Sequence, residues 1–135
     1  MSLPIQVAMK TLNEKYYVCA ENGGGRELVA NRETRGPWET FWLTFIHPSD
    51  SIIAIQTLDG GYYLCADASQ NGILTADRKE FGAWEQFKIT NVGHRQFTLR
   101  AHNGMYVCAD GGGGGRVIAN RDQPGPWETF MIEIV

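Results

Sequence analysis

The chain has 135 residues and carries 12 basic against 15 acidic side chains, which gives a net charge of −3 and a pI near 5.6. This length suits one domain, and the acidic balance argues against nucleic acid as a partner, because such binders usually have a pI above about 9. Glycine (16) and proline (5) together exceed their usual share of about 12%, so we expect a β protein with many tight turns.

The first third of the chain contains four segments typical of short β-strands. In the first, Val7 and Met9 alternate with Ala8 and Lys10, which is the period of a half-buried strand. A glycine-rich turn precedes the third segment, and the fourth begins with Phe41. The four expected strands cover residues 7–10, 16–20, 28–30 and 41–45.

Two further copies of this unit follow. A Tyr-Val/Leu-Cys-Ala motif and a Gly-Pro/Ala-Trp-Glu motif each recur after 46 and then 43 residues, so the spacing inside each copy is constant. We therefore expect one domain over residues 1–135, with repeats at about 5–48, 51–94 and 95–135. The motifs are centred on Cys19, Cys65 and Cys108, and on Trp38, Trp84 and Trp127.

One such unit is too small to bury its own apolar face, so three must share a core. Four strands per unit make about twelve strands, and no segment has the period and length of a helix. Closure into a barrel removes exposed sheet edges. The prediction is an all-β chain folded as a β-trefoil of three pseudo-symmetric four-strand repeats. A three-bladed propeller fits less well, because propellers typically have at least about four blades.

The three cysteines are an odd number and lack the close spacing of zinc sites, so we expect three reduced, buried, apolar side chains. The opening residues do not have the pattern of a signal peptide, and no apolar run approaches the ~20 residues that span a bilayer. If the sequence is a module excised from a longer protein, we expect it to be extracellular, and if it is a complete chain, we expect it to be cytoplasmic. The sequence does not decide between these two compartments.

The strings YVCAENGGG, LVANR and GPWETF resemble fascin-like β-trefoil domains. More narrowly, they resemble the β-glucan-binding trefoil carbohydrate-binding modules of family ninety-two, which are attached to glycoside hydrolases. The resemblance extends from about Val7 to Ile134. The resemblance to the glucan-binding modules implies a non-catalytic module with up to three equivalent sites for β-1,3- or β-1,6-linked glucan. The resemblance to fascin-like domains implies an actin-binding domain instead.

Each copy also places an Asn-Arg or Asp-Arg pair before its Trp-Glu pair. An indole offers a flat apolar face to a sugar ring, carboxylate and amide oxygens accept hydrogen bonds from hydroxyl groups, and arginine donates them. These are the residue types that a polysaccharide site needs. The candidate ligand-binding residues are Asn31, Arg32, Trp38 and Glu39, then Asp77, Arg78, Trp84 and Glu85, and finally Asn120, Arg121, Trp127 and Glu128.

A purely structural interpretation stays open for the same residues. Each tryptophan could cap the barrel, and Arg32 with Glu39 could form an ion pair that fixes a loop. We expect the glycine before each motif (Gly36, Gly82 and Gly125) to have a positive φ. The glycine-rich turns do not match a phosphate-binding loop, so we expect mobile hairpin turns.

Other polar and aromatic residues have less definite roles. An acid follows each Cys-Ala pair, where it could reach a sugar hydroxyl or lie solvated at a strand end: Glu21, Asp67 and Asp110. Trp42 has no counterpart in the other copies and either extends the first site or packs on the surface. The three histidines do not align with one another, so we assign no metal.

No nucleophile motif or zinc helix is present, and an acid repeated in like surroundings does not suit the two unlike carboxylates of a glycosidase. We therefore expect a binding module rather than an enzyme, with no cofactor, and a polysaccharide or oligosaccharide as its partner. We further expect a monomer that contacts neither nucleic acid nor membrane. The resemblance implies attachment to a glycoside hydrolase.

Overall fold

Twelve β-strands account for most of the described chain, residues 4–135 of a computed structural model. The strands are β1 (Ile5–Thr11), β2 (Tyr17–Ala20), β3 (Leu28–Arg32), β4 (Phe41–His47), β5 (Ile52–Thr57), β6 (Tyr63–Asp67), β7 (Ile73–Arg78), β8 (Phe87–Gly93), β9 (Gln96–Ala101), β10 (Tyr106–Ala109), β11 (Val117–Arg121) and β12 (Phe130–Ile134). The predicted all-β fold is confirmed. Short 3-10 helices join strands in each repeat, namely η1 (Glu21–Gly23), η2 (Pro37–Glu39), η3 (Pro48–Asp50), η4 (Ala68–Gln70), η5 (Ala83–Glu85), η6 (Asp110–Gly112) and η7 (Pro126–Glu128).

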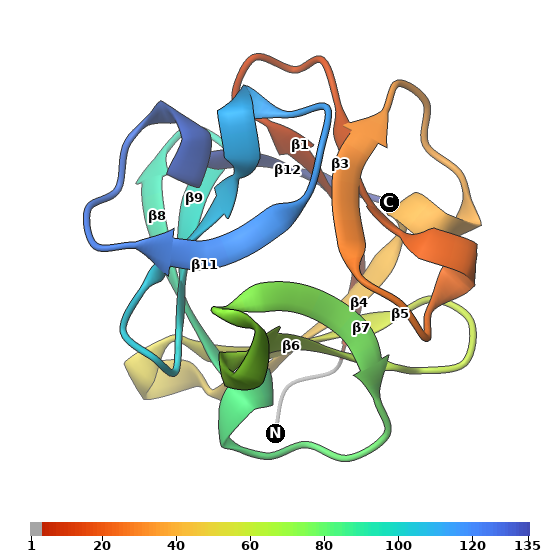
Figure 1. The fold of residues 1–135 in the computed structure, drawn as a ribbon, viewed down its shortest axis with the longest axis vertical. Helices are drawn as coiled ribbons and strands as arrows, with labels where there is room; N and C mark the ends of the chain where they lie inside the picture. The colour runs from red at the N-terminus through yellow and green to blue at the C-terminus, as the bar shows by residue number, and fades with distance from the viewer. Residues whose placement is uncertain (1–3) are drawn as a thin grey trace.

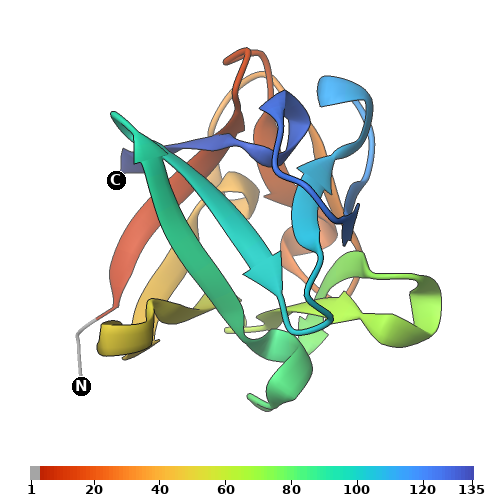
Figure 2. The same cartoon turned by 90° about the vertical axis from the view of Figure 1, so that its left-hand side faces the viewer.

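Six strands form a closed antiparallel barrel (Figure 2). β1 pairs with β4 and β12, β5 pairs with β4 and β8, and β9 pairs with β8 and β12. The register places Val7 beside both Phe41 and Ile134, so the first and last strands of the molecule close the ring. Closure leaves no barrel strand with an unpaired edge.

The other six strands form three hairpins, β2–β3, β6–β7 and β10–β11, that cap one end of the barrel. In Figure 1, β3, β7 and β11 surround an approximate threefold axis. One backbone hydrogen bond recurs between neighbouring hairpins. It runs from the Ala30 N–H to Gly115 O (2.7 Å), from the Ala76 N–H to Arg26 O (2.8 Å) and from the Ala119 N–H to Gly72 O (2.8 Å).

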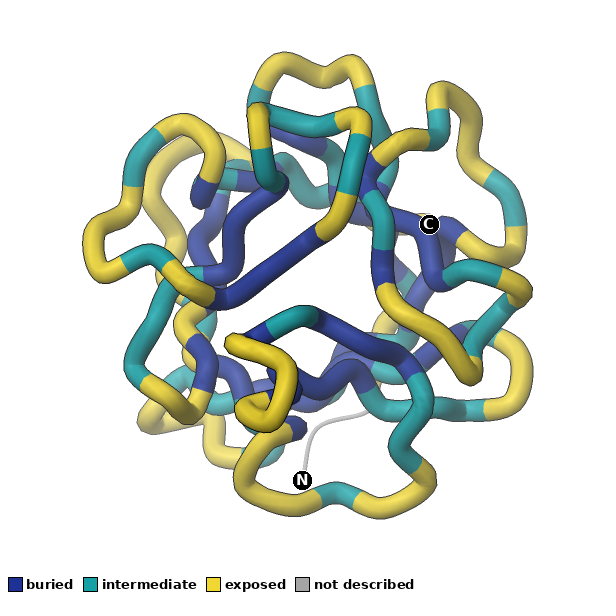
Figure 3. The backbone as a smooth tube through the Cα atoms, viewed as in Figure 1, coloured by how far each residue is buried: buried dark blue, intermediate teal, exposed yellow. Residues whose placement is uncertain are grey.

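The core consists of equivalent residues from the three repeats, and burial is concentrated at the centre of the molecule while the loops are exposed (Figure 3). Val7 and Met9 are buried as predicted, but Ala8 between them is buried as well, so this part of β1 is covered on both faces. The core includes Phe41, Phe87 and Phe130, with Leu28, Leu74 and Val117 from the hairpins. Three units share one core because none buries its apolar face alone.

The three cysteines are free and buried, as the sequence predicts. Within residues 4–135, no helix has the length and apolar character needed to cross a membrane.

Candidate functional site

Each repeat presents one tryptophan at its surface. Trp38, Trp84 and Trp127 are the middle residues of η2, η5 and η7 and are 41%, 40% and 46% exposed. Tryptophan rings that only cap the barrel from inside, as the structural interpretation proposed, would be almost fully buried. The three indoles are instead available to a ligand at equivalent places around the molecule.

The glutamate after each tryptophan is buried and bound to the backbone. Glu39 Oε1 accepts a hydrogen bond from the Gly36 N–H at 2.7 Å. Glu85 and Glu128 accept the same bond from Gly82 and Gly125 at 2.6 Å. The carboxylate thereby satisfies the backbone at the start of each 3-10 helix and fixes the helix that carries the indole.

The predicted positive φ at Gly36, Gly82 and Gly125 is wrong. Their φ angles are −136°, −132° and −136°, which is extended backbone. Glycine is suited to these positions for a different reason, since a Cβ atom would lie only 3.0–3.2 Å from Oε1 of the following glutamate. Glycine is favoured at these positions because the carboxylate approaches the backbone closely, and not because the backbone conformation requires it.

An arginine lies behind each glutamate and joins it to a second acid. The Nε atoms of Arg32, Arg78 and Arg121 lie 3.9–4.0 Å from the glutamate Oε2 atoms, at the outer limit of an ion pair. The terminal nitrogen of each guanidinium meets the acid that follows the Cys-Ala pair. These contacts are Arg32–Glu21, Arg78–Asp67 (3.1 Å) and Arg121–Asp110 (3.4 Å).

The second acids therefore hold the arginines in place, a role that the sequence analysis missed. The signal was present, because an acid and an arginine recur eleven positions apart in every copy. Asp67 also accepts hydrogen bonds from Ser69 and Gln70, which lower its pKa to about 2.

The buried cysteines lie on the inner side of the glutamates. Burial, together with a hydrogen bond to Glu39, raises the pKa of the Cys19 thiol to about 12. The same two causes, with Glu85 and Glu128, raise the pKa of Cys65 and Cys108 to about 12. All three thiols stay protonated at neutral pH, so they act as packing groups and weak donors, and not as nucleophiles.

The asparagine of the Asn-Arg pair orients the arginine. Asn31 Oδ1 accepts from Arg32 Nη1 at 2.5 Å, and Asn120 does the same for Arg121. In the second repeat, Asp77 accepts a hydrogen bond from the Thr75 hydroxyl at 2.8 Å and lies 3.6 Å from Arg78 Nη1. The candidate polar residues of each repeat are thus one connected set.

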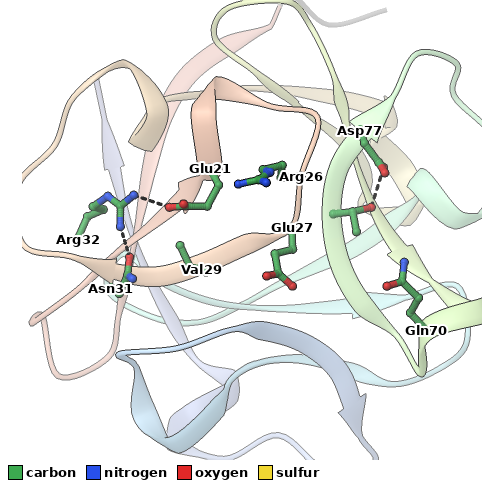
Figure 4. Close-up of a pocket in the computed structure, with 9 residues that line it drawn as sticks. Glu21, Arg26, Glu27, Val29, Asn31, Arg32, Gln70 and Asp77 are labelled. Carbon is green, nitrogen blue, oxygen red and sulfur yellow. Dashed lines mark hydrogen bonds and ion pairs between the residues drawn. The ribbon is translucent and has the colours of Figure 1, made fainter.

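These polar residues nevertheless do not share a hollow with the indoles. A depression of about 520 Å³ on the cap, between the first two hairpins, is lined by Asn31, Arg32 and Asp77 but by neither Trp38 nor Trp84 (Figure 4). Its remaining lining residues are Glu21, Arg26, Glu27, Val29, Gln70 and Thr75.

Two further hollows show the same separation. One of about 480 Å³ is lined by residues 78–82 and by Glu85. Another, of about 290 Å³, contains Trp127 but neither Arg121 nor Glu128. It is lined by Thr11, Leu12, Asn13, Ala109, Gly111, Gly112, Pro126, Trp127 and Thr129. Residues 11–13 are not among the site residues predicted from the sequence.

The glycine-rich turns that were predicted to be mobile pack against aromatic rings. A Cβ atom on Gly24 would lie 2.4 Å from Tyr62, and one on Gly113 would lie 2.5 Å from Tyr16. A Cβ atom on Gly112 would lie 3.1 Å from the Nε1 atom of Trp127. The turns therefore form part of the surroundings of the indoles.

The second repeat builds this turn differently. Positive φ angles occur throughout residues 22–25 and 111–114 but only at Asn71 and Gly72 in the second copy. There, both the N–H and the hydroxyl of Ser69 donate to Asp67. The backbone of the turn in the second repeat consequently differs from that of the turns beside Trp38 and Trp127.

The remaining candidates lie outside these hollows. Trp42 is half-buried on β4, in register with Gln6 and Gln56 of the neighbouring strands. Within residues 4–135, no group of three or more histidine, cysteine or acidic residues is arranged to hold a metal ion.

Solved structures share this fold at low sequence identity. The designed threefold-symmetric protein ThreeFoil superposes with a TM-score of 0.85 at 14% identity, over 96% of this chain and 99% of its own. An exo-β-1,3-galactanase from Clostridium thermocellum matches with a TM-score of 0.83 at 14% identity, over 97% of this chain but 30% of its own. A mosquitocidal holotoxin matches with a TM-score of 0.85 at 12% identity, over 99% of this chain and 17% of its own.

These similarities establish the β-trefoil fold. No curated protein matches the sequence. One family model matches residues 49–133, which is more than half of the chain. The protein therefore belongs to the family described as a domain of unknown function, DUF7910.

Proposed function

We propose that this domain is a non-catalytic carbohydrate-binding module for β-1,3- or β-1,6-linked glucan. The observation that carries the proposal is the exposure of Trp38, Trp84 and Trp127 at equivalent positions on three short helices. A single exposed aromatic ring is common on protein surfaces, but three at equivalent positions of three repeats favour a repeated ligand. A β-linked glucan offers such a ligand, since its rings present apolar C–H faces at regular intervals.

The polar surroundings suit the hydroxyl rim of a sugar. In the second repeat, Arg78 and Glu85 line one hollow, which Trp84 itself does not line, and there they can donate to and accept from hydroxyl groups. The buried glutamate and its arginine are positioned before any ligand arrives, which lowers the entropic cost of binding.

Similarity to known proteins supports a glycan ligand. One solved structure with this fold is named an exo-β-1,3-galactanase, and the shared region covers 30% of that chain. The resemblance of the repeated motifs to β-glucan-binding trefoil modules narrows the ligand to glucan and implies attachment to a glycoside hydrolase.

The arrangement of acids favours binding over catalysis. Glycoside hydrolysis uses two carboxylates in different environments. Here Glu39, Glu85 and Glu128 are equally buried, and each is held by a glycine N–H and an arginine. Three weak sites on one rigid body would instead raise the avidity for a repetitive polymer by roughly 10²–10⁴-fold.

Affinity electrophoresis and calorimetry with soluble β-1,3- and β-1,6-glucans test the proposal. We expect retention of the wild type by at least one glucan, progressive loss in the single, double and triple alanine variants of Trp38, Trp84 and Trp127, and full retention by Trp42→Ala. No retention by either glucan would refute the proposal. Co-sedimentation with actin filaments that glucan does not compete away would support the fascin-like alternative instead.

A further inference from the structure

The hollow at Trp127 is built by both ends of the chain. Trp127 and Gly112 come from the last repeat, whereas Leu12 and Asn13 come from the turn between β1 and β2 in the first. These parts meet because β1 and β12 pair along the barrel, with Thr11 in register with Phe130. The volume of about 290 Å³ lies just below the 300–1,000 Å³ of drug-sized ligand pockets, so it suits one or two sugar rings.

The Asn13 side chain joins the two walls. Its Nδ2 donates to Gly112 O at 3.3 Å, across 99 positions of sequence. Its Oδ1 accepts from the Thr11 hydroxyl at 2.6 Å and from the Lys15 N–H at 3.0 Å. These three contacts fix the amide plane, and the second N–H of Nδ2 has no acceptor among residues 4–135. Asn13 lines the hollow beside an exposed indole, so this amide N–H is available to donate to a ligand there.

The lining of this hollow carries no charged side chain. Leu12 supplies an apolar wall, Trp127 an apolar ring and Asn13 a neutral donor. This combination matches a neutral sugar, which presents an apolar ring face and a hydroxyl rim.

The other two indoles have chemically different walls. Tyr62 packs on the glycine turn beside Trp38 as Tyr16 packs on the turn beside Trp127. The turn that precedes Tyr62 places Asp59 where the first repeat has Asn13, and a carboxylate cannot donate a hydrogen bond. In the third repeat the counterpart, Asn103, donates from Nδ2 to Ala119 O at 3.1 Å and lies beside Gly72 in the turn of the second repeat.

We propose that the Trp127 site holds one hexose unit of the glucan between the last and first repeats, with Leu12 as apolar wall and the Asn13 amide as hydrogen-bond donor. The inference rests on the proposed function and deepens it. It makes the three sites unequal, because Asp59 replaces the donor in the turn that packs beside Trp38, and His102 replaces the apolar Leu12 in the turn that faces the second repeat. The turn between β1 and β2 is then a specificity-determining element of the Trp127 site alone.

Fluorine NMR of the full chain labelled with 5-fluorotryptophan tests this site by site. Single Trp→Phe variants assign the resonances, and titration with β-1,3- and β-1,6-linked gluco-oligosaccharides gives a Kd for each indole. We expect Leu12→Ala and Asn13→Ala each to raise the Kd at Trp127 by roughly 3- to 10-fold, the effect of one lost contact. The Kd values at Trp38 and Trp84 should change less than twofold.

Lys15→Ala is the matched control, since Lys15 is exposed in the same turn and only its backbone N–H contacts Asn13. It should leave all three Kd values unchanged. An unchanged Kd at Trp127 in both Leu12→Ala and Asn13→Ala would overturn this inference and leave the proposed function intact. If no oligosaccharide shifts any tryptophan resonance of the wild type, the proposed function itself fails, and this inference fails with it.

Discussion

Gly36 and Glu39 lie three residues apart and are bound to each other: the backbone N–H of the glycine donates to Oε1 of the glutamate at 2.7 Å. Pro37 and Trp38 lie between them in the sequence. The contact therefore fixes the direction in which the Trp38 side chain projects from the surface. The same contact recurs at Gly82–Glu85 and at Gly125–Glu128. Stability and the placement of the exposed rings are therefore coupled in each repeat.

Replacing the buried carboxylate by an amide should test this coupling. We expect Glu39→Gln to lower the free energy of unfolding by about 1–3 kcal/mol, since it weakens the bond to Gly36 and leaves Arg32 facing a neutral group. Urea denaturation measures the change, and Glu85→Gln and Glu128→Gln should give similar values. Exposed Glu33→Gln should stay within about 0.5 kcal/mol. Equal effects of Glu33→Gln and Glu39→Gln would contradict the assigned role.

The contact between the last glycine turn and Tyr16 gives a second prediction. Gly113 has a φ of +122°, and a Cβ atom there would lie 2.5 Å from the tyrosine ring. We expect Gly113→Ala to destabilise the protein by about 2–4 kcal/mol, measured by thermal and urea unfolding. Gly115→Ala, where a Cβ atom meets nothing within 4 Å, should be neutral or slightly stabilising. Similar losses in the two variants would count against this packing.

Asp67 should make stability depend on pH in the acid range. Its pKa is lowered to about 2, first by the Ser69 hydroxyl and then by Gln70. A carboxyl whose folded pKa is depressed stabilises the fold above its ordinary value of 3.8, and this stabilisation is lost as the pH falls toward 2. Asp67→Asn should therefore cost about 2 kcal/mol at pH 7 and almost nothing near pH 2.

Urea unfolding at several pH values between 2 and 7 checks this expectation. Ser69→Ala serves as the companion variant, because loss of its hydroxyl should shift the loss of stability to higher pH. A constant difference between wild type and Asp67→Asn across the range would disprove the assigned cause.

The closure of the barrel rests partly on Glu133. Its carboxylate accepts from the Tyr17 hydroxyl at 3.0 and 3.1 Å and lies 3.1 Å from Lys10 Nζ and 2.9 Å from Arg35 Nη1. A double-mutant cycle of Tyr17→Phe and Glu133→Gln should give a coupling energy of about 0.5–1.5 kcal/mol. Glu14→Ala, which removes the looser and more exposed pair with Lys10, should change stability by less than about 1 kcal/mol. Additive effects in the cycle would show that the hydrogen bond contributes nothing.

The thiols should be inert in the folded protein. Burial, aided by hydrogen bonds to the glutamates, raises the pKa of Cys19, Cys65 and Cys108 to about 12, so the thiolate fraction at pH 8 is very small. Ellman's reagent should report almost no reaction in native buffer and three equivalents in denaturing urea. Rapid reaction of the native protein would contradict the burial of these side chains.

The fold could be predicted because the same motifs recur in three copies along the sequence. The constant spacing between each cysteine and its tryptophan, with buried apolar residues such as Val7 and Met9 in the first strand, specifies three equal units with a common core. The residue types of the candidate sites could be identified in the same way, and the indoles are exposed as a binding role requires.

The details that could not be predicted depend on contacts between distant parts of the chain. The extended φ of Gly36 follows from where the Glu39 carboxylate lies, which no local glycine preference reveals. The contribution of Leu12 and Asn13 to the Trp127 hollow depends on closure of the barrel by its first and last strands. No pattern within either repeat carries that information.

The pairing of β1 with β12 also has a topological consequence. The Val135 N–H donates to Gln6 O at 3.0 Å, so the two ends of the barrel sequence lie side by side. A short linker could join them, and the chain could be reopened in the exposed segment 48–50 without breaking any strand. Such a circular permutant would bring the last and first repeats together as consecutive sequence, and the sequence separation of the hydrogen bond between Asn13 and Gly112 would fall from 99 positions to 36 plus the linker.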